Sequence, residues 1–176
     1  SSDIWNQALG QIAVKGNNEK EMVKFYSALY NAHFLPRTFS DVDGSYPRFD
    51  GDGQIMKMDH GTYYCDFSQW DTYRAVHPLF SILTPSRNGD MAHSLVLKGQ
   101  QGGWLPIFPS WNSYTAAMIG DHCIAMIGDA IVKDTPGFDY EEAYTLMRKN
   151  AFEANPDSGS YRDGKGRRAM ESYLKY

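Results

Sequence analysis

Apolar residues in this chain recur mostly at the spacing of an α-helix, and this periodicity constrains the fold more than any other feature. The clearest run occupies positions i, i+3, i+4, i+7 and i+8: Met22, Phe25, Tyr26, Leu29 and Tyr30. This run predicts an amphipathic helix that buries an aromatic-rich face and ends before Pro36. Helical spacing over residues 4–15, broken by Gly-Asn-Asn at 16–18, predicts a helix before it. Together these segments predict a helical hairpin.

Helical periodicity continues along the rest of the chain. Residues 70–83 are apolar at helical spacing, and Pro78 inside this segment predicts either a kink or a new helix start. Further helices are predicted from a cap at Asp90 to about 102–103, over 113–133, over 139–147 and over 167–176. Successive helix pairs joined by aromatic-rich loops predict an all-α fold in which helical hairpins form a toroid or barrel.

Residues 39–64 interrupt this pattern with Asp, Gly and short apolar pieces, which predicts a loop insertion with about two short strands. Its carboxylates are hard oxygen ligands, so a calcium-binding loop is the alternative to structural turns. The carboxylates concerned are Asp41, Asp43, Asp50 and Asp52. Their spacing does not match an EF-hand, so structural turns are expected and no metal ligand is assigned within the chain.

The charge balance excludes one large class of partners. The 176 residues fit one domain and carry 17 Lys and Arg against 21 Asp and Glu, a formal net charge of −4, which argues against nucleic acid. No apolar run approaches the length of a membrane-spanning helix, so no membrane partner is expected. Cys65 and Cys123 lack metal-ligand spacing and are expected to be buried, with their pairing left open.

The segment 67–74 (FSQWDTYR) places an indole, a carboxylate and a guanidinium on one helical turn, at Trp70, Asp71 and Arg74. A carboxylate and a guanidinium can together bind neighbouring hydroxyls of a sugar, and the indole can cover the C–H face of the ring. The alternative is a helix start capped by Ser68, with Asp71 and Arg74 forming a surface ion pair.

Two polar residues, Asp121 and His122, interrupt the most apolar segment of the chain, 113–133, which is predicted to be a buried helix. Buried polar groups need hydrogen-bond partners. The two side chains could therefore face a ligand cavity or tie this helix to its neighbours.

Four blocks, in this order, closely resemble glycoside hydrolase family 92, the exo-acting α-mannosidases. They are FYSALY at 25–30, DVDGSY at 41–46, FSQWDTYRAVHP at 67–78 and GWLPIFPSWNSYTAAMIGDH at 103–122. Residues 112–115 resemble the eukaryotic, especially fungal, members. The resemblance implies that residues 1–176 form part of an (α/α)6-barrel catalytic domain. An N-terminal β-sandwich normally precedes that domain, and the barrel continues downstream of the last residue here.

The resemblance also implies an activity and its partners. Family members remove terminal mannose from α-mannosides, such as the α-1,2-linked mannose of N-glycans, with inversion and with help from calcium. The mannose-binding residues of the family match Trp70, Asp71 and Arg74. The general base and most calcium ligands are expected downstream, in the remainder of the same enzyme. Mannosylated glycans are the implied substrates, and the secretory pathway or the extracellular space is the implied location.

The sequence departs from the family pattern at Tyr114. Bacterial α-1,2-mannosidases of the family place the general acid, a glutamate, just before the threonine that matches Thr115. A neutral tyrosine is a poorer proton donor than a carboxylic acid with a raised pKa. The site surroundings are therefore expected to comprise Tyr114, Thr115, Asp121 and His122, and the identity of the acid is left open. A non-catalytic helical protein that kept the fold for carbohydrate binding or assembly is the alternative to a hydrolase.

Overall fold

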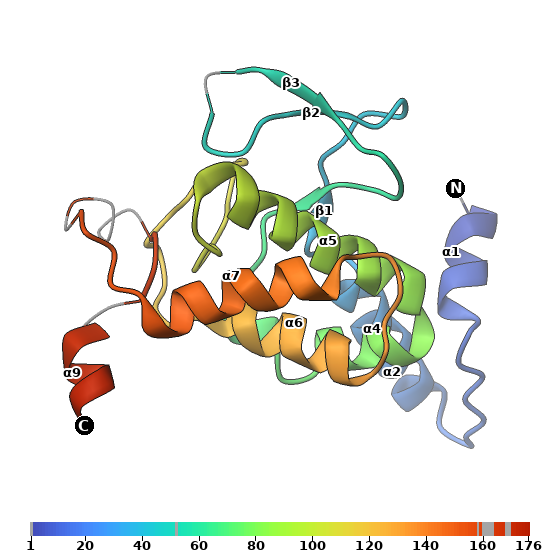
Figure 1. Ribbon diagram of the computed structural model, residues 1–176. Coiled ribbons are helices and arrows are strands. Elements are labelled where there is room, and N and C mark those ends of the chain that lie inside the picture. Colours follow the sequence, from blue (N-terminus) through green and yellow to red (C-terminus); the bar gives the residue numbers. More distant parts are fainter. Residues whose placement is uncertain (1, 52, 158, 160–163, 168–169) are drawn as a thin grey trace. The chain divides into compact units, whose positions relative to one another are not determined.

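The computed structural model of the protein describes residues 2–51, 53–157, 159, 164–167 and 170–176 (Figure 1). The chain divides into two compact units, residues 1–35 and residues 36–176. Each unit is described by itself. None of the helices in the described segments has the length and hydrophobicity needed to cross a membrane.

The first unit is the predicted helical hairpin, made of α1 (Ser2–Leu9) and α2 (Glu19–Ala32). The rings of Trp5 and Tyr30 meet edge to face, with centroids 4.5 Å apart. The first helix ends at Leu9, earlier than predicted, because the hydroxyl of Tyr26 holds the following backbone in an irregular conformation. That hydroxyl donates to the carbonyl of Ile12 at 2.9 Å and accepts from the N–H of Val14 at 3.2 Å.

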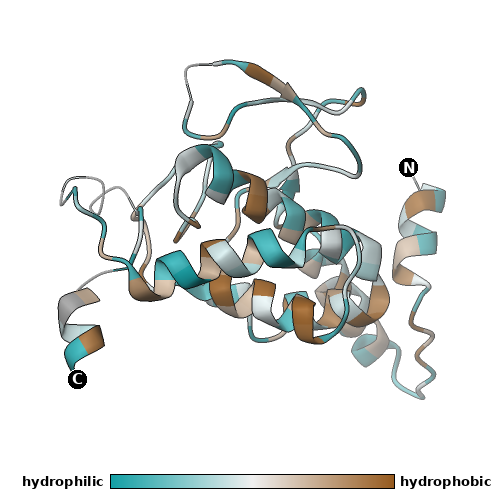
Figure 2. Cartoon of the chain, in the orientation of Figure 1, coloured by the Kyte–Doolittle hydropathy of each residue, from teal (hydrophilic) through white to brown (hydrophobic). Residues whose placement is uncertain are grey.

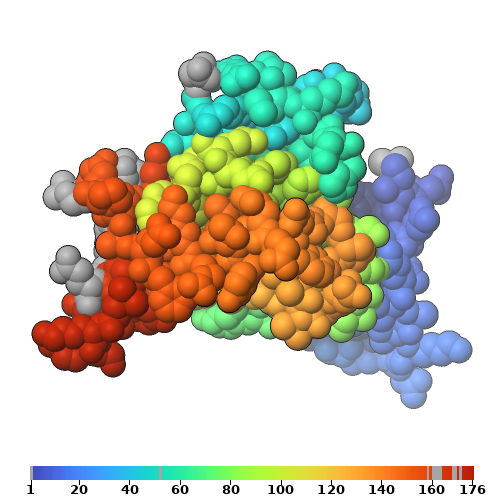
Figure 3. Space-filling model, viewed as in Figure 1, coloured from blue at the N-terminus to red at the C-terminus, as the bar shows by residue number. Residues whose placement is uncertain are grey.

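The second unit is built around α5 (Pro85–Gly102), which packs against α4 (Val76–Leu83), α6 (His122–Val132) and α7 (Tyr140–Phe152). Two short helices, α3 (Gln69–Thr72) and α9 (Met170–Lys175), complete its helical part. Hydrophobic and hydrophilic residues alternate along α6 and α7, as expected for helices that bury one side (Figure 2). Figure 3 shows these two helices covering one face of this unit, with α5 beside them.

One large hydrophobic core lies between these helices. Its fully buried members include Phe67, Phe80, Met91, Leu95, Leu105 and Ile127. Glycines bring the elements close together: a Cβ at Gly89 would lie 1.8 Å from the carbonyl oxygen of Pro136. The segment before α7 is thus pressed directly onto the α5 backbone. The helices form no closed barrel within the described residues, and they agree with an all-α fold made of helical hairpins.

The insertion contains four short strands in two antiparallel pairs. β1 (Arg37–Thr38) pairs with β4 (Tyr64–Cys65), and β2 (Ser45–Pro47) pairs with β3 (Ile55–Lys57). The β2–β3 ribbon stands beside α5 (Figure 1). A small cluster of Tyr46, Met58 and Tyr63 packs against Leu97 of that helix. The predicted loop and short-strand insertion around residues 39–64 is therefore confirmed, with four short strands where about two were expected.

Two predicted helix starts are wrong. The helix expected over 113–133 begins only at His122, because Gly120 has a left-handed φ of 93° and the residues before it are held by side-chain bonds to the 104–108 loop. Ile119, expected in the core, is 70% exposed. The helix expected to be capped by Asp90 begins at Pro85, and the Asp90 carboxylate instead accepts from the N–H of Thr62 at 3.1 Å.

A lysine lies at the centre of the second unit. Lys98 of α5 is completely buried, and its Nζ donates to the carbonyl of Tyr64 at 2.6 Å. Nζ also lies 3.6 Å from the centroid of the Tyr63 ring. Because burial penalises the charged form, the pKa of Lys98 falls from 10.5 to about 7.

Candidate functional site

The turn predicted to bind a sugar has some residues buried in the core and others exposed. Phe67 and Gln69 are completely buried, and the Phe67 N–H donates to the carbonyl of Pro109 at 3.1 Å. Trp70, Asp71 and Arg74 are exposed on the other side of this segment. The buried residues anchor α3 to the core and leave the three side chains of the predicted subsite accessible.

Asp71 and Arg74 make local contacts that orient their charged groups. The Ser68 hydroxyl donates to Oδ2 of Asp71 at 2.5 Å, and Nη1 of Arg74 donates to the carbonyl of Trp70 at 2.5 Å. The Arg74 guanidinium lies 4.6 Å from the centroid of the Tyr73 ring. Within the described residues Asp71 and Arg74 form no ion pair with each other, and the Ser68 side chain makes no capping bond. The helix start of the alternative interpretation is therefore present, with Ser68 at the N-cap position, but its side-chain cap and its ion pair are not.

His122 lies against this turn. The rings of Tyr73 and His122 have centroids 4.5 Å apart and are inclined at 32°. Gly120 makes this placement possible, because a Cβ there would lie 2.4 Å from Cε1 of His122. The structure thus brings together two regions that the sequence had singled out separately, the 67–74 turn and the Asp121-His122 pair.

Asp121 borders a pocket of about 460 Å³. Its carboxylate forms an ion pair with Nη2 of Arg167 at 2.6 Å, and the Arg167 guanidinium stacks on the Tyr173 ring at 3.9 Å. The remaining walls are mainly apolar and are formed by Ile107, Ala116, Met118, Ile119 and Gly120. Asp121 therefore ties the start of α6 to the segment before α9 and supplies charge at the edge of a mostly apolar pocket.

Tyr114 and Thr115 bond to the backbone of the 104–108 loop. The Tyr114 hydroxyl donates to the carbonyl of Trp104 at 2.5 Å and accepts from the N–H of the same residue at 3.2 Å. Its ring packs at 4.7 Å against Phe49. Burial raises the pKa of Tyr114 above its ordinary value. The Thr115 hydroxyl donates to the carbonyl of Phe108 at 2.6 Å. Both hydroxyls hold loop backbone in place.

Asp66, which the sequence did not single out, organises the loops beside the turn. It is 8% exposed and has a left-handed φ of 60°. Its carboxylate accepts from the N–H of Trp111 at 2.8 Å, from the Ser110 hydroxyl at 3.2 Å and from Nε of Arg37 at 2.7 Å. Trp111, thus held, leaves its indole 80% exposed. Aspartate tolerates left-handed backbone better than most residues, but nothing in the sequence marks this position.

Both cysteines are buried and unpaired. Burial raises the pKa of the Cys65 thiol, and it raises the pKa of the Cys123 thiol to about 12. Both thiols therefore stay protonated and behave as small hydrophobic groups, as expected.

The described residues do not fit a calcium site. Asp41 accepts from the N–H of Val42, Asp43 accepts from both the N–H and the hydroxyl of Ser45, and Asp50 pairs with Lys165. The structural turns expected there are confirmed for these residues, whereas Asp52 lies outside the described part of the chain. Among the described His, Cys, Asp and Glu residues, one cluster has its ligand atoms close enough to bind a single metal ion, and two of its three members are histidines. Calcium prefers six to eight oxygen ligands.

Comparisons with known proteins agree with this architecture. Residues 1–176 match the family model of the glycosyl hydrolase family 92 catalytic domain. A solved family GH92 α-mannosidase from Bacteroides thetaiotaomicron, in complex with mannoimidazole, is 36% identical over 91% of this chain, with a TM-score of 0.81. A family GH92 inverting mannosidase from the same organism is 28% identical over 99% of this chain, with a TM-score of 0.85. The chain spans 21% and 23% of those two chains. No curated protein matches it.

Proposed function

Because this chain belongs to glycosyl hydrolase family 92, as part of its catalytic domain, we propose that it forms part of an enzyme that removes terminal mannose from α-mannosides with inversion. Two similar solved structures support the proposal, since one binds mannoimidazole and the other is an inverting mannosidase. Residues outside 1–176 would complete the (α/α)6 barrel, because this chain spans under a quarter of each similar structure.

The observation that carries the proposal is the exposed trio Trp70, Asp71 and Arg74. The Asp71 carboxylate, oriented by Ser68, can accept hydrogen bonds from sugar hydroxyls. The Arg74 guanidinium keeps donors available beyond its bond to the Trp70 carbonyl, because it carries five N–H groups. The Trp70 indole, 37% exposed, offers an apolar face to the C–H side of a pyranose. We assign this trio to the mannose subsite.

The buried position of Tyr114 bears on the proton donor. Its hydroxyl is bonded to Trp104 in both directions, and a general acid must reach the leaving oxygen. We therefore propose that Tyr114 is a structural residue and that the acid comes from another part of the enzyme. Calcium would likewise be bound by residues elsewhere, and we derive no role for it from this chain. We also propose that the complete enzyme acts on N-glycans and is secreted.

The experiment that tests the subsite is the change Asp71→Ala in the full-length protein, assayed on an α-mannoside. Loss of a charged hydrogen-bond acceptor should lower kcat/KM by roughly 10- to 150-fold. Glu141→Ala is the matched control, because Glu141 is an exposed acid on the first turn of α7. An unchanged kcat/KM for Asp71→Ala would remove this residue from the subsite.

A second candidate function is carbohydrate binding without hydrolysis. It is favoured because the Tyr114 hydroxyl, at the position of the expected acid, already donates its proton to the carbonyl of Trp104. Calorimetry with mannose and a turnover assay on the same preparation separate the two. Mannose binding that Asp71→Ala abolishes, without any turnover, would support a binding protein. Turnover lost in the same variant would support the hydrolase.

A further inference from the structure

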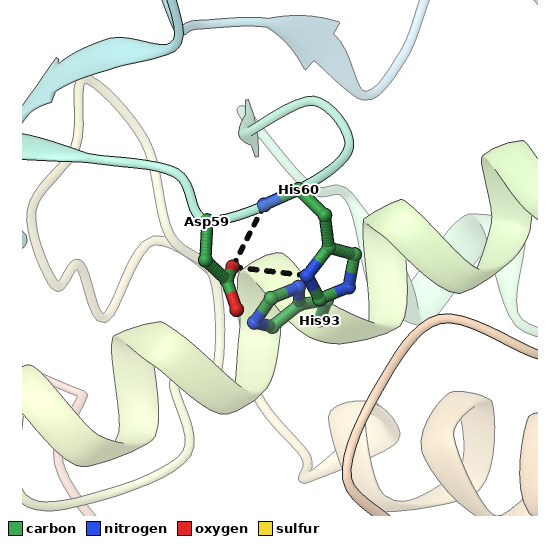
Figure 4. Close-up of side chains that lie close together, drawn as sticks. All are labelled: Asp59, His60 and His93. Carbon is green, nitrogen blue, oxygen red and sulfur yellow. Dashed lines mark hydrogen bonds and ion pairs between the residues drawn. The ribbon is translucent and has the colours of Figure 1, made fainter.

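Three potential metal ligands meet away from the exposed turn. Asp59 and His60 lie in the segment between β3 and β4, and His93 lies on α5 (Figure 4). Each offers one ligand atom, and these atoms all lie within 4.8 Å of one another. The rings of His60 and His93 stack with centroids 4.6 Å apart and planes inclined at 25°. Nothing in the proposed mannose subsite accounts for this cluster.

The contacts of His60 place its Nδ1 beside the Asp59 carboxylate. Nε2 lies 3.0 Å from the carbonyl oxygen of Gly137, and because a carbonyl only accepts, Nε2 carries the proton. Nδ1 faces the Asp59 carboxylate, which also only accepts, so a bound metal ion would replace the proton that Nδ1 shares with it. Nδ1 lies 3.0 Å from Oδ1 of Asp59, so the two potential ligand atoms already face each other. Metal-binding histidines commonly donate their other N–H to a backbone carbonyl in this way.

His93 contributes an unsatisfied nitrogen. Its Nδ1 is buried and has no hydrogen-bond partner in the described structure. A buried polar atom without a partner costs free energy, and such atoms in native proteins usually have a ligand, an ion or water to bind. A metal ion bound by Nδ1 would satisfy this nitrogen.

The backbone around the cluster is tightly fitted. A Cβ at Gly61 would lie 2.2 Å from Oδ1 of Asp90, and the Asp90 carboxylate accepts from the N–H of Thr62. The segment that carries His60 is thereby held against α5 at Asp90, which lies about one helical turn before His93. Gly89, pressed onto the Pro136 carbonyl, fixes the neighbouring 134–137 segment that supplies the Gly137 carbonyl. Three segments distant in sequence thus hold the ligand atoms close together.

We propose that Asp59, His60 and His93 bind one divalent transition-metal ion of the Zn²⁺ class, with water in the remaining position. Two imidazole nitrogens and one carboxylate oxygen suit Zn²⁺, Co²⁺ or Ni²⁺, whereas Ca²⁺ and Mg²⁺ prefer oxygen ligands. Bonds of about 2 Å require ligand atoms roughly 3 to 4 Å apart. The Asp59 and His60 side chains, 74% and 51% exposed, are free to make this small adjustment. The ion would clamp the segment between β3 and β4 onto α5.

Co²⁺ titration of the untagged full-length protein tests the site, because imidazole-bound Co²⁺ absorbs visible light. We expect one Co²⁺ per chain, displacement of it by Zn²⁺, and a Zn²⁺-dependent rise in Tm that a chelator reverses. His60→Ala should weaken Co²⁺ binding at least about ten-fold, since a ligand is removed. His122→Ala is the matched control, because it removes a histidine outside the cluster and should leave binding unchanged.

Circular dichroism of each variant shows whether it is folded. His60 is exposed, so its replacement should preserve the fold, and Asp59→Asn provides a second variant with the same expected loss. Absence of stoichiometric Co²⁺ binding to the unmodified protein would overturn the proposal. Equal Co²⁺ affinity in the unmodified protein, His60→Ala and Asp59→Asn would also overturn it, because the ion would then be bound elsewhere.

Discussion

The ring of Tyr73 lies against the imidazole of His122, with centroids 4.5 Å apart, and so joins the exposed turn to the start of α6. The Arg74 guanidinium also lies over the Tyr73 ring. Arg74, Tyr73 and His122 therefore form a continuous stack. A change at the start of α6 should be transmitted to the guanidinium that we assign to mannose binding.

Gly120→Ala should disturb that stack. The left-handed φ of 93° and the approach of 2.4 Å to His122 both oppose a Cβ. We expect a loss of about 2 to 3 kcal/mol in the free energy of unfolding, and weaker mannoside binding. Gly53→Ala is the control, because Gly53 has a φ of 87° but no atom within 4 Å of its Cβ position. It should cost only about 1 kcal/mol. Equal losses in denaturant titrations would refute the steric argument.

Tyr114→Phe separates a structural role from a catalytic one. The change removes the hydroxyl that satisfies both the N–H and the carbonyl of Trp104, so we expect a loss of about 1 to 3 kcal/mol in stability. Below its unfolding temperature the variant should keep its kcat on a mannoside. A large fall in kcat at unchanged stability would instead identify Tyr114 as the proton donor.

Lys98 should make stability depend on pH. Its pKa is about 7 in the folded protein and about 10.5 when unfolded, so between these values the unfolded chain binds more protons. The free energy of unfolding should therefore rise with pH across this window, by about 2 kcal/mol between about pH 7 and about pH 9. Below the folded pKa the contribution of Lys98 should be constant. Lys98→Met, compared by denaturation at the same pH values, should lack this rise, and parallel curves would argue against it.

Asp139→Ala tests the start of α7. Oδ1 of Asp139 accepts from the N–H of Glu142 at 3.0 Å, which caps the helix. Its loss should cost about 1 kcal/mol in thermal or chemical denaturation. Glu141→Ala removes a first-turn acid that makes no such bond, so it should cost only a few tenths of a kcal/mol through the helix dipole. A comparable cost for both changes would mean that charge, and not the cap, stabilises this end.

Local signals explain which parts of the fold could be predicted. α2 was predicted because its apolar residues recur at helical spacing, and α7 because a capping aspartate, Asp139, marks its start. The start of α6 was missed because Met118 and Ile119 extend the apolar pattern, although both side chains are exposed. That exposure depends on the conformation of Gly120 and on bonds from distant loop residues. The spacing of apolar residues in the sequence reveals neither of them.

The candidate site shows the same limit. The exposure of Trp70, Asp71 and Arg74 close together in the chain followed from their spacing, although α3 ends at Thr72, before Arg74. The inward orientation of Tyr114 did not, because it depends on the Trp104 backbone. The burial of Lys98 was equally unpredictable, since a lysine within a helix is normally on the surface. Contacts between remote segments decide such cases.

The contact of Gly89 with the Pro136 carbonyl has an evolutionary consequence. No side chain can be added at position 89 unless the backbone near position 136 moves away from α5. Relatives that replace this glycine should therefore also carry an insertion, a deletion or a different turn before α7. An alignment of such relatives should show the two positions changing together. Position 89 would then indicate, for each relative, whether the segment before α7 lies directly on α5.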